Sequence, residues 1–108
     1  MDIKIHATNF QLNKAQEEKL NEKVAKLESL AGRLSDESAE AKLDVELQAS
    51  QKDEETFACH LTIFVPGDTL RAEAEDASLE NVVDDVIGKI RGQIEKYKAR
   101  TQHINDHK

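Results

Sequence analysis

The chain has 108 residues, of which 38% are hydrophobic, 34% are charged and only 4% are aromatic, and its formal net charge is −7. These values describe one soluble domain with a mainly aliphatic core, and they exclude a membrane span and disorder throughout the chain. A single cysteine, Cys59, excludes an internal disulfide, and no leader-like segment opens the sequence, so we expect a cytoplasmic protein.

A short strand and an amphipathic helix are predicted first. Ile3, Ile5 and Ala7 alternate with polar residues, which is typical of a strand with one buried face. The helix has Asn13 as its predicted N-cap and Gln16 as the return partner of a capping box, and it should end at Gly32 or within residues 35–38. Its apolar stripe consists of Leu20, Val24, Leu27, Ala31 and Leu34. One flank of this stripe carries Lys19, Lys23, Lys26 and Arg33.

Three further strands are predicted in the middle of the chain. Residues 41–49 alternate without a break between apolar and polar side chains, which is the strongest strand pattern in the sequence. Residues 57–65 and 70–74 alternate in the same way. The polar run 50–55 and the Pro-Gly-Asp sequence at 66–68 are typical of hairpin turns. We therefore expect three consecutive strands that are joined by hairpins.

The last predicted element is a long amphipathic helix, which Ser78 caps. Its apolar stripe consists of Leu79, Val83, Val86, Ile90, Ile94 and Tyr97. Cations border this stripe on both sides: one edge carries Lys89, Lys96 and Arg100, and the other carries Arg91 and Lys98.

These elements predict an α+β fold with the order β-α-β-β-β-α. The simplest arrangement is one four-stranded sheet with two helices packed on one face, because every helix and strand has a single apolar side to bury. Residues 1–100 are predicted to form a single domain. Residues 101–108 are predicted to be a disordered tail.

No group of side chains has the pattern of a catalytic site, so we predict a protein that is not an enzyme and needs no cofactor. Asp84 and Asp85 are neighbours on a helix, where side chains point about 100° apart. Cys59 and His60 are neighbours on a strand and therefore leave opposite faces of the sheet.

A metal site is not predicted either. His103 and His107 are four residues apart, which is a suitable spacing for metal ligands on a helix. They lie in the predicted tail, however, and no recognisable motif surrounds them.

Positive charge is concentrated in the two predicted helices. Residues 14–33 contain five Lys or Arg against four Asp or Glu, and residues 86–100 contain five against one, whereas residues 35–55 and 68–85 are strongly acidic. Basic helices in an acidic molecule indicate a polyanionic partner that is bound along one face. The alternative is that the lysines only keep two helices soluble. Because aromatic residues that could stack on bases are scarce, the pattern favours folded RNA recognised by shape and charge.

Two blocks of sequence sharpen this interpretation. The first helix contains Ala15 and the lysine-rich run Lys-Val-Ala-Lys-Leu-Glu at 23–28. The second block runs without a gap from Gly67 to Lys98 and includes Leu70, Ala72, Ala74, Glu75, Val83, Asp84, Val86, Ile87, Lys89, Ile90, Gln93, Ile94 and Lys96. In the order, spacing and length of these blocks, the chain resembles the short form of the bacterial ribosome hibernation promoting factor and ribosome-associated inhibitor family, up to about residue 100.

The resemblance implies a translation inhibitor that binds the small ribosomal subunit in the channel for messenger and transfer RNA. The basic helices would lie against ribosomal RNA, and inhibition would come from occlusion, with no membrane and no small-molecule substrate involved. Carried over by position, the RNA-binding residues are Lys23, Lys26, Lys89, Lys96 and Lys98. Arg91 and Arg100 join them on charge and helical position.

A second hypothesis belongs to a different class. The same fold could serve as an acidic protein-interaction module, in which the acidic strands and loops bind a basic protein partner. Binding that survives nuclease treatment would favour this alternative. An enzyme ranks third, and it would require a deep pocket with converging polar groups.

Overall fold

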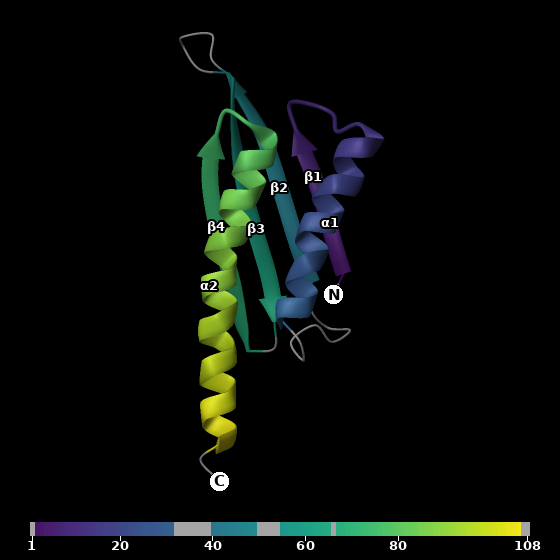
Figure 1. The fold of residues 1–108 in the computed structure, drawn as a ribbon. Coiled ribbons are helices and arrows are strands. Elements are labelled where there is room, and N and C mark those ends of the chain that lie inside the picture. Colours follow the sequence, from purple (N-terminus) through teal and green to yellow (C-terminus); the bar gives the residue numbers. More distant parts are fainter. Residues whose placement is uncertain (1, 32–39, 50–54, 66, 107–108) are drawn as a thin grey trace.

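The computed structural model describes residues 2–31, 40–49, 55–65 and 67–106. Its elements follow the predicted order β-α-β-β-β-α (Figure 1). Their bounds are β1 Asp2–Thr8, α1 Lys14–Ala31, β2 Glu40–Ala49, β3 Glu55–Val65, β4 Asp68–Asp76 and α2 Leu79–Asp106. The predicted α+β fold is confirmed. Residues 32–39, where the first helix was predicted to end and which include Arg33 and Leu34, lie outside the described residues, as do the turn residues 50–54 and Pro66.

The four strands form one mixed sheet in the order β1-β2-β3-β4. β1 and β2 are parallel because α1 connects them as a crossover, whereas β2, β3 and β4 are antiparallel neighbours. Leu43 on β2 lies opposite Ile5 on β1 and opposite Leu61 on β3, and Leu61 lies opposite Ala72 on β4. This register puts the apolar side chains of all four strands on the same face of the sheet.

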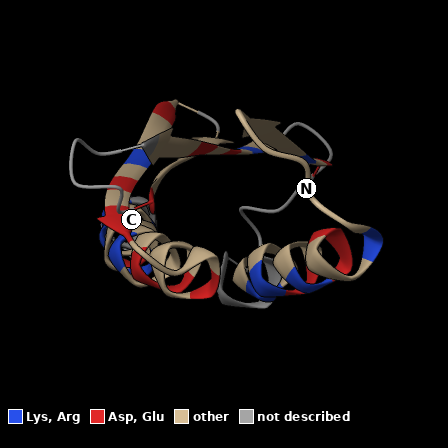
Figure 2. Ribbon diagram, turned by 90° about the horizontal axis from the view of Figure 1, so that it is seen from above, with Lys and Arg blue, Asp and Glu red and all other residues tan. Residues whose placement is uncertain are grey.

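Both helices cover that apolar face and leave the other face of the sheet open (Figure 2). The core between the two layers consists of Leu20, Val24, Leu27, Ala41, Leu43, Val45, Cys59, Leu61, Ile63, Val65, Leu70, Ala72, Val82, Val83, Val86, Ile90, Ile94 and Tyr97. Val82 is fully buried, although the predicted stripe of the second helix omitted it, and Leu79, which the stripe included, is only half-buried. Leu79 is the first residue of α2, and Val82 and Val83 are both fully buried, so the buried face near the start of α2 is wider than the predicted stripe.

The two predicted N-caps are confirmed. The Asn13 side-chain oxygen accepts a hydrogen bond from the Gln16 amide at 2.7 Å, and the Gln16 side chain accepts one from the Asn13 amide at 3.0 Å. Ser78 Oγ accepts a bond from the Asn81 amide at 3.3 Å. These bonds satisfy backbone donors at the helix starts and fix where α1 and α2 begin.

The two helices start at the same end of the sheet and run side by side in the same direction (Figure 1). Neither of them, over the residues described, is long and apolar enough to cross a membrane. α2 continues to Asp106, so the backbone of residues 101–106 is helical. The predicted domain boundary at residue 100 stays a prediction.

Candidate nucleic-acid interface

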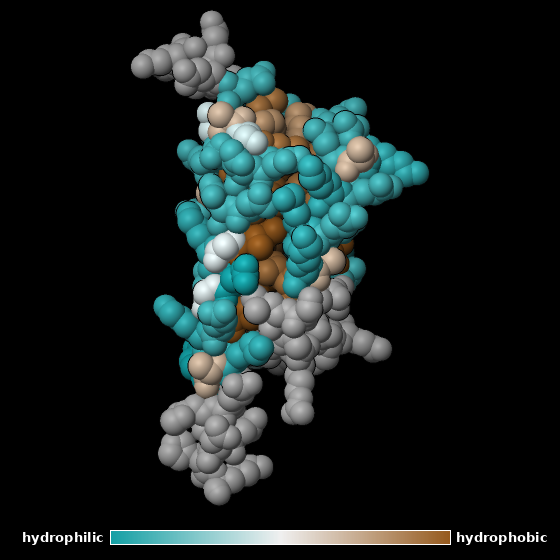
Figure 3. Space-filling view, in the orientation of Figure 1, coloured by the Kyte–Doolittle hydropathy of each residue, from teal (hydrophilic) through white to brown (hydrophobic). Residues whose placement is uncertain are grey.

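Three of the predicted RNA-binding residues meet in a groove between the two helices. Lys23 and Lys26 come from α1 and Arg91 comes from α2, and together with Leu27, Asp84 and Ile87 they line a cavity of about 330 Å³. We call this cavity the helix groove. Figure 3 shows apolar surface along the seam between the helices, with hydrophilic side chains on both sides. Lys26 and Arg91 are exposed, so both charges are accessible to a ligand.

The helix groove has an apolar floor and a charged rim. Leu27 is 1% exposed and packs in the core, and Ile87 is half-buried against it, which holds the two helices together. Side chains that follow on the same helix leave about 100° away, so Lys26 points out of the core beside Leu27. The amphipathic pattern of the sequence thus places cations along the line where the helices meet.

Two ion pairs join α1 and α2: one lies in the helix groove, and the other lies beyond it, nearer the helix N-termini. Lys19 Nζ lies 2.5 Å from Glu80 Oε1, and Lys23 Nζ lies 2.6 Å from Asp84 Oδ1. The hydrogen bond between Lys19 and Glu80 raises the pKa of the lysine and lowers the pKa of the glutamate. Sequence reasoning missed these pairs. Lys19 and Lys23 are four residues apart, and so are Glu80 and Asp84. On two parallel helices, this equal spacing predicts the two pairs.

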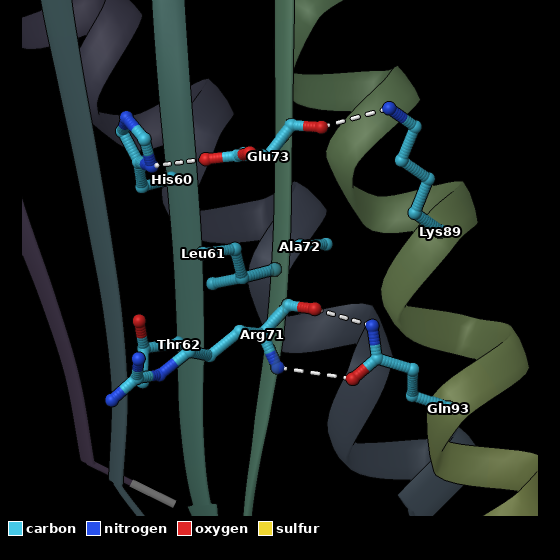
Figure 4. A pocket seen from close by; sticks show the side chains of 8 residues that line it. All are labelled: His60, Leu61, Thr62, Arg71, Ala72, Glu73, Lys89 and Gln93. Atoms are coloured by element: carbon cyan, nitrogen blue, oxygen red, sulfur yellow. Dashed lines mark hydrogen bonds and ion pairs between the residues drawn. The ribbon is translucent and has the colours of Figure 1, made fainter.

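The other edge of α2 follows the outer edge of β4, and we call it the strand edge. The Gln93 side-chain amide accepts a hydrogen bond from the Arg71 backbone amide and donates one to the Arg71 carbonyl. Lys89 Nζ donates to the Glu73 carbonyl at 2.8 Å (Figure 4). Arg100 pairs with Asp68 at 2.6 Å, and this bond lowers the pKa of the Asp68 carboxyl.

These contacts give the strand edge a structural role. An edge strand exposes unpaired backbone amides and carbonyls, which favour pairing with another chain. Gln93 pairs with β4 as a neighbouring strand would, and Lys89 adds a further bond. Gln93 was part of the family resemblance, but nothing in the sequence indicated that it binds the edge of the sheet.

The structure therefore divides the seven predicted RNA-binding residues into two groups. Lys23, Lys26 and Arg91 meet in the helix groove. Lys98 lies two turns beyond Arg91 and so on the same side of α2. The strand edge carries Lys89, Lys96 and Arg100. The split confirms that the cations border two different edges of α2.

The open face of the sheet is acidic. Its six carboxylates outnumber its three Lys and Arg side chains, and the members are Asp2, Glu40, Asp44, Glu46, Glu73 and Glu75 against Lys4, Lys42 and Arg71. Phe64 is the exposed large hydrophobic residue on this face, and Lys42 Nζ lies 5.5 Å from the centre of its ring. The open face is therefore acidic, whereas α1 and α2 carry acidic residues and Lys or Arg in equal number.

A cavity of about 700 Å³ lies around β4 (Figure 4). It is lined by His60, Leu61, Thr62, Arg71, Ala72, Glu73, Lys89 and Gln93. Four of its polar side chains already have partners: Lys89 and Gln93 bind the β4 backbone, and His60 Nδ1 lies 3.3 Å from Glu73 Oε2.

Cys59 is buried, and burial raises the pKa of its thiol to about 12, so it is no nucleophile at neutral pH.

No three metal-ligating side chains come together in the described part of the chain. Of the two tail histidines, His107 lies outside the described residues, and the structure describes only the backbone of His103.

The fold and the groove define a class: a small α+β domain with one acidic face and one helical face that carries a cationic groove. A family model for "Sigma 54 modulation protein / S30EA ribosomal protein" matches residues 3–102. The chain belongs to this family, which consists of ribosome-associated factors and not of enzymes. The resemblance to the hibernation promoting factor family is confirmed.

Solved structures show the same fold. The N-terminal domain of Thermus thermophilus Protein Y is 22% identical with a TM-score of 0.67, and the alignment covers 90% of this chain and 99% of that one. A ribosomal subunit interface protein from Coxiella burnetii is 20% identical with a TM-score of 0.69, covering 92% of this chain and 99% of that one. Among curated protein sequences there is no match.

Proposed function

We propose that this protein is a ribosome hibernation factor that binds small-subunit ribosomal RNA through its basic helices and blocks the channel for messenger and transfer RNA. The family supports the ribosome as partner. One observation carries the choice of surface: cations from two helices that are far apart in the sequence converge on the helix groove. A cytoplasmic location follows from the proposed partner.

The helix groove suits a phosphate backbone better than it suits bases. Lysine and arginine donate charge-assisted hydrogen bonds to phosphate oxygens, and they need no base identity to do so. Phe64, the exposed aromatic residue of the described surface, lies on the opposite, acidic face. The proposed binding is therefore insensitive to base sequence and sensitive to salt, because each phosphate contact releases counterions.

A sedimentation experiment tests this proposal. Wild-type protein and the double variant Lys26→Glu/Arg91→Glu are centrifuged with purified small subunits at low and at physiological salt, and a translation assay measures inhibition. The wild type should co-sediment and inhibit, and the variant should do neither. The matched control is Lys4→Glu/Lys42→Glu, which makes the same charge change on the open sheet face and should leave both readouts intact. Equal loss in both double variants would contradict the assignment of the helix groove.

The acidic open face of the sheet supports the second hypothesis, a module that binds a basic protein. This face carries twice as many carboxylates as basic side chains. A pull-down with and without nuclease separates the two hypotheses. A protein partner retained after nuclease treatment, with no ribosomal RNA recovered, would favour the interaction module.

A further inference from the structure

The ion pair between Lys23 and Asp84 joins a predicted RNA-binding cation to a carboxylate of the same molecule. Lys23 Nζ lies 2.6 Å from Asp84 Oδ1, and the two residues are 61 positions apart in the chain. The Lys23 side chain is only 20% exposed, whereas the Asp84 side chain is 56% exposed. Asp84 is therefore accessible to solvent and occupies a hydrogen-bonding position at Lys23 Nζ that an incoming phosphate would otherwise take.

Positive charge is uneven along the line where the helices meet. Toward the helix N-termini, Lys19 and Lys23 are paired with Glu80 and Asp84, so carboxylates of the same molecule balance both charges. Further along, Arg91 lines the helix groove and is exposed. A polyanion can therefore contact this exposed cation before it reaches Lys23.

We propose that Asp84 is a specificity-determining residue that occupies Lys23 in the free protein and is displaced by a phosphate of the bound RNA. This inference rests on the proposed function of the helix groove. A free phosphate has to compete with a carboxylate that is already in place. A phosphate on a strand that Lys26 and Arg91 already hold is present at a high effective concentration and can replace it. Asp84 therefore favours extended polyanions over single anions.

The competing explanation is that the pair only fastens α1 to α2. In that case removal of the carboxylate lowers stability and brings no gain in binding. The two explanations predict opposite signs for the change in affinity of Asp84→Asn, because competition weakens RNA binding in the wild type whereas a fastening contact supports the groove.

The test measures binding of purified small ribosomal subunits to Asp84→Asn and to Asp85→Asn over a range of salt concentrations. Asp85 is the next residue of α2 and is also exposed, so its substitution makes the same charge change and serves as a matched control. Asp84→Asn should bind about threefold to tenfold more tightly at each salt concentration, and the slope of log affinity against log salt should stay nearly the same, because Lys23 contacts a phosphate in both complexes. Asp85→Asn should change affinity less than twofold. Melting curves confirm that both variants fold.

A second pair of proteins tests whether Asp84 acts through Lys23. In a Lys23→Met background, Asp84→Asn should change the affinity less than twofold. Equal tightening with Asp85→Asn, no tightening with Asp84→Asn, or full tightening in the Lys23→Met background would each overturn the inference. If the wild type itself fails to bind small subunits, the proposed function fails. If the wild type binds and Asp84→Asn binds no more tightly, the inference alone fails.

Discussion

The two edges of α2 carry the same kind of residue in different surroundings. On the side of the helix groove, Arg91 faces a cavity that it shares with Lys23 and Lys26 of α1. On the strand edge, Lys89 binds a backbone carbonyl of β4 and Arg100 binds Asp68. Cations that border an apolar helix stripe can therefore bind a partner or bind the protein's own sheet. Sequence alone does not distinguish the two roles, because the cations of both edges recur at helical spacing.

Charge reversal should give the largest difference between the two edges. Lys26→Glu/Arg91→Glu removes two cations from the helix groove and is expected to weaken small-subunit binding roughly 100-fold at physiological salt, with little change in stability. Lys89→Glu/Lys96→Glu on the strand edge should weaken binding only about tenfold and should also lower the melting temperature. Sedimentation titrations and melting curves measure both effects. A larger loss of affinity from the strand-edge pair would reverse the roles given to the two edges.

Removal of the Gln93 side chain should weaken the strand edge without touching the groove. Gln93→Ala leaves the amide and the carbonyl of Arg71 without their partner and is expected to cost about 1–2 kcal/mol of unfolding free energy. Urea denaturation measures this loss. Gln93→Glu keeps the acceptor but loses the donor, so it should fall between the wild type and Gln93→Ala. If Gln93→Ala is as stable as the wild type, the edge contact contributes nothing.

A substitution on the exposed side of α2, between the helix groove and the strand edge, should stabilise the protein. Gly92 lies on the outer side of α2, and an added Cβ would meet no atom within 4 Å. Gly92→Ala should therefore raise the unfolding free energy by about 0.5–1 kcal/mol, as expected for an exposed helix position. The measurement is again urea denaturation. A loss of stability would show that the helix needs the glycine for a reason that its surroundings do not reveal.

The ion pair between Arg100 and Asp68 should give a small, pH-dependent effect. The bond lowers the pKa of Asp68 from its ordinary value of 3.8, so this stabilisation is present above that value and is lost as the pH falls through the lowered pKa. Arg100→Met should melt slightly earlier than the wild type at neutral pH, and the difference should shrink in acid. Melting temperatures across this pH range test the sign. A difference that grows in acid would rule out this explanation.

The sequence predicted the fold because each element has a local pattern. Alternation in residues 41–49 and the capping box of Asn13 and Gln16 depend only on near neighbours, and both were correct. The candidate site was predicted only in part. The pairing of Lys23 with Asp84 and of Gln93 with Arg71 depends on how α2 lies against α1 and β4, which no local period encodes. Val82, by contrast, lies three residues after Leu79 and four before Val86, so helical spacing alone could have placed it in the core.

We infer that the helix groove faces ribosomal RNA, and an electron cryo-microscopy structure of the protein on the small ribosomal subunit would show this contact. We expect α1 and α2 to lie against the RNA, with the Lys26 and Arg91 side chains within hydrogen-bond distance of phosphate oxygens. A complex in which the open sheet face contacts the ribosome and the helix groove faces solvent would contradict it.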